Sequence, residues 1–213
     1  MLSLFLASFV TFFVAIDPVA MAPMFVTMTE RMSPQWRRFM AFKSIAIATG
    51  ILLAFAFGGA WLLGQIHVSI DAFRIAGGLL LFLIAVDMLF EKRSERREER
   101  AEKVAAEQAS HPGRQDDISV FPLAIPLIAG PGAIASIMLF FAEHQDLASR
   151  SMVLAGMAAN LALCLVAFLL SGPLNRLMGE TVASMLTRIF GILLAALAAQ
   201  FVVDGIRNAF GIA

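Results

Sequence analysis

The sequence predicts an all-α polytopic membrane protein whose six transmembrane segments form two inverted three-helix repeats. Three observations lead to this fold class. First, 60% of the 213 residues are hydrophobic and 15% are charged, whereas a soluble domain carries about 25% charged residues. Second, apolar runs of bilayer-spanning length recur along the chain. Third, two of these runs contain similar proline motifs.

Six apolar runs are long enough to cross a membrane. The expected segments are 2–30, 39–64, 72–90, 119–142, 151–171 and 186–207. The first is too long for one straight span, and Asp17-Pro18 interrupts it. It starts without a basic stretch, so we expect no cleavable signal sequence.

The proline motifs indicate an internal repeat. AIDPVAMAP (15–23) aligns with AIPLIAGP (124–131), and FRIAGGLLLFLIA (73–85) aligns with TRIFGILLAALAA (187–199). Each half holds three spans, and an odd number makes the second copy enter the membrane from the opposite face. This architecture is typical of secondary transporters, whose sites lie on discontinuous helices. The expected parts are repeat 1 at 1–92, broken near 17–23, a charged loop at 93–117, and repeat 2 at 118–213, broken near 126–132.

The charged loop 93–117 is rich in Ala, Glu and Arg. We expect a solvated connector whose front half extends the third helix into water, with a regulatory or partner-docking role as the alternative. Most Lys and Arg residues lie in this loop and in those after the first and fifth segments. The positive-inside rule therefore places the loop in the cytoplasm and both termini in the periplasm of a bacterium.

The broken segments suit a small zwitterion. Proline removes an N–H and frees carbonyl groups that lipid cannot satisfy, so such a break must be buried or line a wet cavity. Asp17-Pro18 is expected to end one half-helix, with Pro23 in the first turn of the next. Pro126 is expected to end another half-helix, and Gly130–Ala133 to open the following one. Helix N-termini attract a carboxylate, while freed carbonyls and Asp17 suit an ammonium group or a cation.

The expected solute site is made of small residues, which favour a compact ligand. Its predicted members are Asp17, Pro18, Ala20, Met21, Ala22, Pro23, Ala129, Gly130, Pro131, Gly132, Ala133 and Asn160. Asn160, in the fifth segment, either bonds across helices or meets the ligand. The residues expected to couple an ion or to serve structure are Asp17, Arg74, Asp87, Arg188 and Gln200. An ion pair with Asp71 or interfacial anchoring also explains Arg74, and Asp87 lies close enough to a helix end to reach water.

The sequence points away from metals, cofactors and catalysis. Cys164 is the one cysteine, and the three histidines fall in expected loops. We therefore expect no disulfide, no metal and no enzymatic activity, with H⁺ or Na⁺ as the coupling ion. The expected partners are a small zwitterionic solute and the bilayer, with no nucleic acid, and the oligomeric state stays open.

IDPVAMAPMF, FRIAGGLLLFLIAVDMLF, PLAIPLIAGPGAI and RIFGILLAALAAQFVVDGI together resemble the MarC family of bacterial inner-membrane proteins. The resemblance covers nearly the whole chain apart from the charged loop. Many relatives carry a glycine where this chain has Ala20. The resemblance implies six spans, and one branch, the SnatA-type proteins, is described as transporting small neutral amino acids such as glycine and alanine.

We therefore expect secondary transport of a small neutral amino acid by alternating access. The alternatives are an exporter or channel for another small solute, and a non-transporting membrane subunit that docks a partner through its charged loop.

Overall fold

The computed structural model describes residues 1–90, 92–110, 117–171 and 180–211, and all regular structure in these ranges is helical. Within these ranges, five helical segments are long and apolar enough to cross a membrane, and one bent pair of helices makes a sixth if it counts as one span. The prediction of an all-helical polytopic protein is therefore confirmed.

The first segment is broken at a single residue. Helix α1 (Leu2–Ile16) is followed by Asp17 and then by α2 (Pro18–Thr29). Asp17 adopts a left-handed backbone conformation, with φ 61° and ψ 67°. Pro18 takes the first helical position of α2, where its fixed φ fits and its missing N–H has no partner to lose. The expected position of Pro23 is wrong: it lies inside α2, because Pro18 already opens that helix.

The second segment is broken by a bend of 58° between η1 (Ser119–Ile128) and α6 (Pro131–Glu143). Extended backbone at Phe121 and Ile125 interrupts η1, and the bonds from these residues to the following prolines are cis. The helical backbone is thus interrupted directly before Pro126, where a break was expected, and η1 resumes up to Ile128 before the bend. Pro131 opens α6 in the way that Pro18 opens α2.

Four long helices complete the bundle. They are α3 (Pro34–Gln65), α4 (Ile70–Leu89), α7 (Leu147–Leu169) and α9 (Glu180–Phe210). The side chains of Ser33, Ser69 and Asp146 accept hydrogen bonds from N–H groups three residues ahead and so cap α3, α4 and α7.

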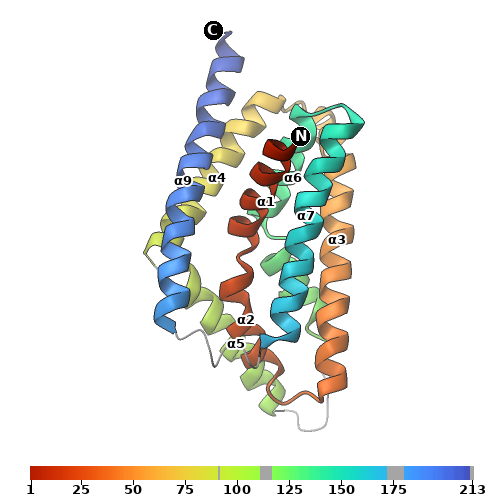
Figure 1. Ribbon diagram of the computed structural model, residues 1–213, viewed down its shortest axis with the longest axis vertical. Helices are drawn as coiled ribbons and strands as arrows, with labels where there is room; N and C mark the ends of the chain where they lie inside the picture. The colour runs from red at the N-terminus through yellow and green to blue at the C-terminus, as the bar shows by residue number, and fades with distance from the viewer. Residues whose placement is uncertain (91, 111–116, 172–179, 212–213) are drawn as a thin grey trace.

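The helices pack in three main groups. α4 lies along α9, α1 along α7, and α3 against α6 and η1 (Figure 1). A Cβ atom on Gly78 would lie 2.8 Å from the Ala198 carbonyl oxygen, so this glycine lets α4 and α9 approach closely. Large apolar side chains such as Phe57, Trp61 and Leu83 are exposed on the outside of the bundle. In a bilayer these side chains face lipid.

The charged segment forms a helix, α5 (Lys92–Ser110), which packs against α2 and α4. It lies at the end of the molecule opposite the start of α1 and the end of α9 (Figure 1). A helix in this region was expected, but a fully solvated connector is wrong: Arg97 and Ala101, one turn apart on the same face, are buried. Residues 111–116 of the loop lie outside the described residues.

Candidate functional site

The two breaks lie next to each other inside the bundle. A Cβ atom on Gly132, in the first turn of α6, would lie 3.8 Å from the Cβ of Ala15, near the end of α1. The same atom would lie 3.0 Å from Ile84 Cδ1 and 3.3 Å from Leu81 Cδ2, both on α4. The end of α1 and the start of α6 therefore meet against α4.

Asp17 joins the two halves of the first segment. Its N–H donates to the Phe13 carbonyl (2.8 Å) and closes α1, while its Oδ1 accepts a bond from the Ala20 N–H (3.3 Å) and caps α2. In an unbroken helix, the Ala20 N–H would donate to the carbonyl of Ile16, four residues earlier. The break therefore frees the Ile16 carbonyl.

Arg97 of α5 occupies both acceptors at this break. Its Nη1 lies 3.3 Å from Asp17 Oδ2, and its Nη2 donates to the Ile16 carbonyl at 3.2 Å. The two side chains are 7% and 2% exposed, so the ion pair is buried. Sequence reasoning missed Arg97, since it is one of many arginines in a charged segment. The available signal was its spacing from Ala101 and the half-buried Val104, which marks a narrow inward face.

Helix α7 borders the same place. The buried Cys164 thiol lies close enough to Asp17 and Arg97 for their charges to act on it. One turn earlier, Asn160 Nδ2 donates to the Phe9 carbonyl of α1 at 2.7 Å. The expected bond across helices is therefore present. Asn160 Oδ1 is buried and has no hydrogen-bond partner among the described residues.

The other predicted lining residues differ in burial. Those that are buried are Pro18, Met21, Ala22, Ala129, Gly130, Gly132 and Ala133. Ala20 and Pro23 are half-buried, and Pro131 is exposed. Pro131 therefore contributes by opening α6 rather than by lining an interior surface.

Two of the remaining polar residues form ion pairs with partners that the sequence did not reveal. Arg74 Nη2 lies 2.9 Å from Glu143 Oε1, which ties α4 to the end of α6. The alternative explanation of Arg74 by an ion pair with Asp71 is therefore wrong, whereas interfacial anchoring stays a prediction. Asp87, near the end of α4, is held by both Nη atoms of Arg96 at 3.0 Å each.

Two polar residues of α9 lie away from the breaks. Gln200 Nε2 donates to Asp204 Oδ1 at 2.8 Å along the exposed side of the helix. Arg188 is also exposed. Of the five residues expected to couple an ion or to serve structure, only Asp17 lies at a break.

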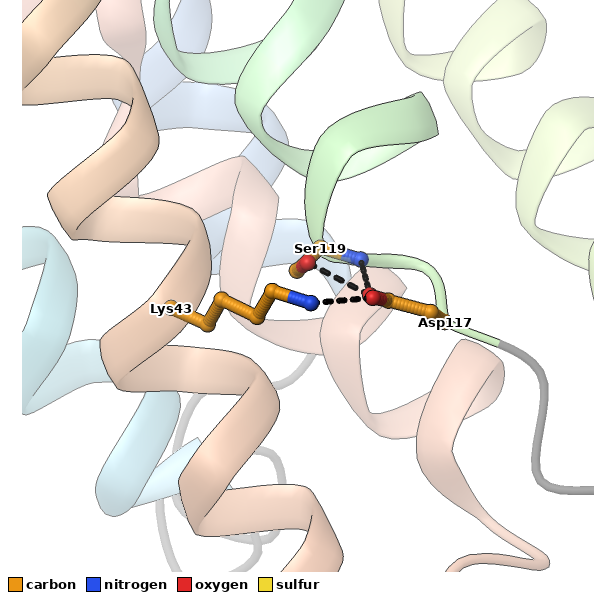
Figure 2. Close-up of polar contacts among 3 residues, drawn as sticks. All are labelled: Lys43, Asp117 and Ser119. Carbon is orange, nitrogen blue, oxygen red and sulfur yellow. Dashed lines mark hydrogen bonds and ion pairs between the residues drawn. The ribbon is translucent and has the colours of Figure 1, made fainter.

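A polar cluster fixes the start of η1 on α3. Figure 2 shows the Asp117 carboxylate between the Lys43 ammonium and Ser119, whose N–H donates at 3.0 Å. The hydrogen bond from Lys43, followed by that from Ser119, lowers the pKa of Asp117 to about 2. Asp117 therefore carries its charge throughout the physiological pH range.

The fold and its two broken segments define a polytopic helical membrane protein. The profile of the MarC family integral membrane proteins matches residues 2–210. The chain belongs to this family.

Relatives in archaea and bacteria match over nearly their full lengths. A UPF0056 membrane protein of Methanocaldococcus jannaschii is 36% identical over 98% of each chain. YvbG of Bacillus subtilis is 31% identical over 99% of this chain and 97% of its own. YhcE of Escherichia coli is 34% identical over 95% of this chain and 91% of its own. YvbG and YhcE are both named UPF0056 membrane proteins. No solved structure matches the chain.

Proposed function

We propose that this protein is a secondary transporter of small neutral amino acids, of glycine or alanine size, that works by alternating access. The proposal rests on the position of the two breaks, because the end of α1 and the start of α6 lie next to each other. The first N–H groups of α6 suit the carboxylate of such a solute. Asp17 and the freed Ile16 carbonyl, one to two residues beyond Ala15, suit its ammonium group.

The small side chains around the two breaks support a compact solute. Ala15, Ala129 and Ala133 are buried and have the smallest side chains after glycine. A methyl group on Gly132 would already press on Ile84 at 3.0 Å. Free amino acids with large side chains would therefore require the helices to separate.

The packing supports the inverted repeat that alternating access would use. Under a two-fold relation, α1–α2 corresponds to η1–α6, α3 to α7, and α4 to α9. The contact of α1 with α7 then has its counterpart in that of α3 with η1 and α6, and α4 contacts α9 across the axis. The aligned prolines are used differently in the two halves, so the correspondence concerns helices rather than single residues.

The distribution of charge supports an orientation in the inner membrane of a bacterium with both termini outside. Arg37 donates to Ser171 at the end of α7, and Lys43 pairs with Asp117. These basic residues gather on the side of the bundle where α5 lies, which the positive-inside rule assigns to the cytoplasm.

The test is uptake of radiolabelled glycine and alanine into proteoliposomes of the purified protein, with a proton gradient, with a sodium gradient, or with neither. We expect saturable uptake that one gradient increases. Non-saturable uptake that ignores both gradients would indicate a channel. No uptake by folded protein would overturn the proposal and favour a non-transporting subunit that docks a partner on the exposed face of α5.

The variant Asp17→Asn tests the site itself. We expect it to lower uptake by at least about tenfold, because the ammonium group loses its counter-charge. Asp204→Asn is the matched control, since it also removes a hydrogen-bonded carboxylate but lies on α9, away from the breaks. Equal uptake by both variants would remove Asp17 from the mechanism.

A further inference from the structure

Helix α5 inserts one narrow face between α2 and α4. Arg97, Ala101 and Val104 point inward, whereas Glu98, Glu102 and Lys103 are exposed. A helix with this distribution is held by a few inward contacts and can leave for water without exposing a large apolar surface.

The inward contact of Arg97 occupies the acceptors that a solute ammonium group would need. Its guanidinium bridges Asp17 Oδ2 at 3.3 Å and the Ile16 carbonyl at 3.2 Å. A carboxylate beside a free carbonyl binds any cation that carries N–H donors, so guanidinium and ammonium compete for one place.

We propose that α5 is the inner gate of the transporter and that Arg97 is a tethered cation, displaced from Asp17 by the ammonium group of the solute. Withdrawing Arg97 alone would leave a buried carboxylate without a counter-charge, which is costly. Exchanging it for the ammonium group keeps Asp17 neutralised. The gate therefore opens only when solute has taken its place, and this couples solute binding to opening.

A second attachment sets where α5 rests. Arg96, the residue before Arg97, holds Asp87 at the end of α4 with two contacts of 3.0 Å. Arg96 is 65% exposed, so this pair is solvated and contributes little to stability. The Arg96–Asp87 pair positions α5 against α4, whereas the buried Arg97–Asp17 pair holds the gate closed.

The chain carries its own reporter of this movement. Cys164, the one cysteine of the chain, is fully buried and lies close enough to Arg97 and Asp17 for their charges to act on it. A charged methanethiosulfonate reagent reaches its thiol only if water enters where α5 now packs. The experiment measures the rate of Cys164 labelling by mass shift, in proteoliposomes with reagent on both sides of the bilayer.

We expect Arg97→Gln to raise this rate at least tenfold over wild type, and Arg97→Lys, which keeps a cation, to raise it much less. Lys103→Gln is the matched control, because it removes one positive charge from the exposed face of the same helix. If Arg97→Gln does not fold, Asp17→Asn/Arg97→Gln removes both charges and leaves none unpaired, and we expect equally fast labelling. A rate within twofold of Lys103→Gln in every folded variant lacking Arg97 would overturn the gate.

The displacing group rests on the proposed function, but gate opening is measured without any solute. Fast labelling of the Arg97 variants, together with no glycine or alanine uptake by wild type, would uphold the gate and reject the proposed solute. Uptake by wild type together with unchanged labelling of the Arg97 variants would uphold the proposed solute and reject the gate.

Discussion

At Asp17, one carboxylate serves two helices and one ion pair. Oδ1 caps α2 through the Ala20 N–H, while Oδ2 faces Arg97. The backbone is left-handed, a conformation that Asn and Asp adopt more readily than other non-glycine residues. Asparagine therefore preserves the cap and the backbone and removes only the charge, which separates structural from electrostatic roles.

Asp17→Asn should destabilise the protein by leaving Arg97 buried without a partner. Removing one member of a buried pair costs about 3–5 kcal/mol, or roughly 6–20 °C in unfolding temperature for a chain of this size. We expect Asp17→Asn/Arg97→Gln to recover most of the loss, since no charge is left unpaired. Thermal unfolding of the purified proteins in detergent gives both values. A double variant less stable than Asp17→Asn would show that the cost lies in packing instead.

In the proposed site, the space at Gly132 limits the size of the solute that can bind. A methyl group there would occupy the space between Ala15 and Leu81, so Gly132→Ala should disfavour alanine more than glycine. One methyl group in a tight pocket changes discrimination by about 10–200-fold. The ratio of glycine to alanine uptake should therefore rise at least about tenfold. Gly58→Ala, where no atom lies within 4 Å of the new Cβ, should leave the ratio unchanged.

At the scale of elements, apolar length and proline predict the spans and their breaks, but they do not predict contacts between distant segments. The interruption at Asp17-Pro18 follows from local chemistry, since proline cannot continue the preceding ladder. The burial of Arg97 depends on α5 folding back under α2, which hydropathy alone does not show. The misplaced Pro23 has a local cause: Pro18 already takes the first helical position.

The packing of α4 on α9 depends on Gly78. A Cβ atom there would lie 2.8 Å from the Ala198 carbonyl oxygen and 2.8 Å from Val202 Cγ2, so the helices must separate. We expect Gly78→Ala to cost about 1–3 kcal/mol in stability. Gly50→Ala is the control, because its new Cβ would meet no atom within 4 Å and alanine favours a helix. Thermal unfolding of both variants gives the comparison, and equal stability would contradict the close approach.

The attachment of η1 to α3 should depend on pH. The pKa of Asp117 is lowered from 3.8 to about 2 in the folded protein. Its stabilising contribution is therefore present above the unfolded pKa near 4 and is lost as pH falls through the folded value. Asp117→Asn should unfold at a lower temperature than wild type near pH 6, and the difference should shrink as the pH falls toward 2 and vanish below it. A difference independent of pH would remove the charge of Asp117 from the explanation.

At the scale of the whole molecule, ion pairs lie toward both ends of the bundle. The α5 end holds Arg97–Asp17 and Arg96–Asp87, and the opposite end holds Arg74–Glu143, which ties α4 to α6. Arg97–Asp17 and Arg74–Glu143 join elements that are distant in sequence, whereas Arg96–Asp87 joins the consecutive helices α4 and α5. Alternating access requires one end to open while the other stays closed, and these pairs are the contacts that would have to break in turn.

The orientation of the protein in the membrane determines which end of the bundle faces the cytoplasm. Gln145, between α6 and α7, and Lys103, on α5, are both exposed. In a Cys164→Ser background, we expect an impermeant maleimide to label Gln145→Cys in intact spheroplasts, and Lys103→Cys only after the membrane is permeabilised. This follows from the excess of Lys and Arg on the α5 side, which translocates poorly. The reverse pattern would place α5 outside and make it an outer gate, with the Arg74–Glu143 pair on the cytoplasmic side. Labelling of both cysteines in intact spheroplasts would contradict either orientation, because the two positions would then share one face of the membrane.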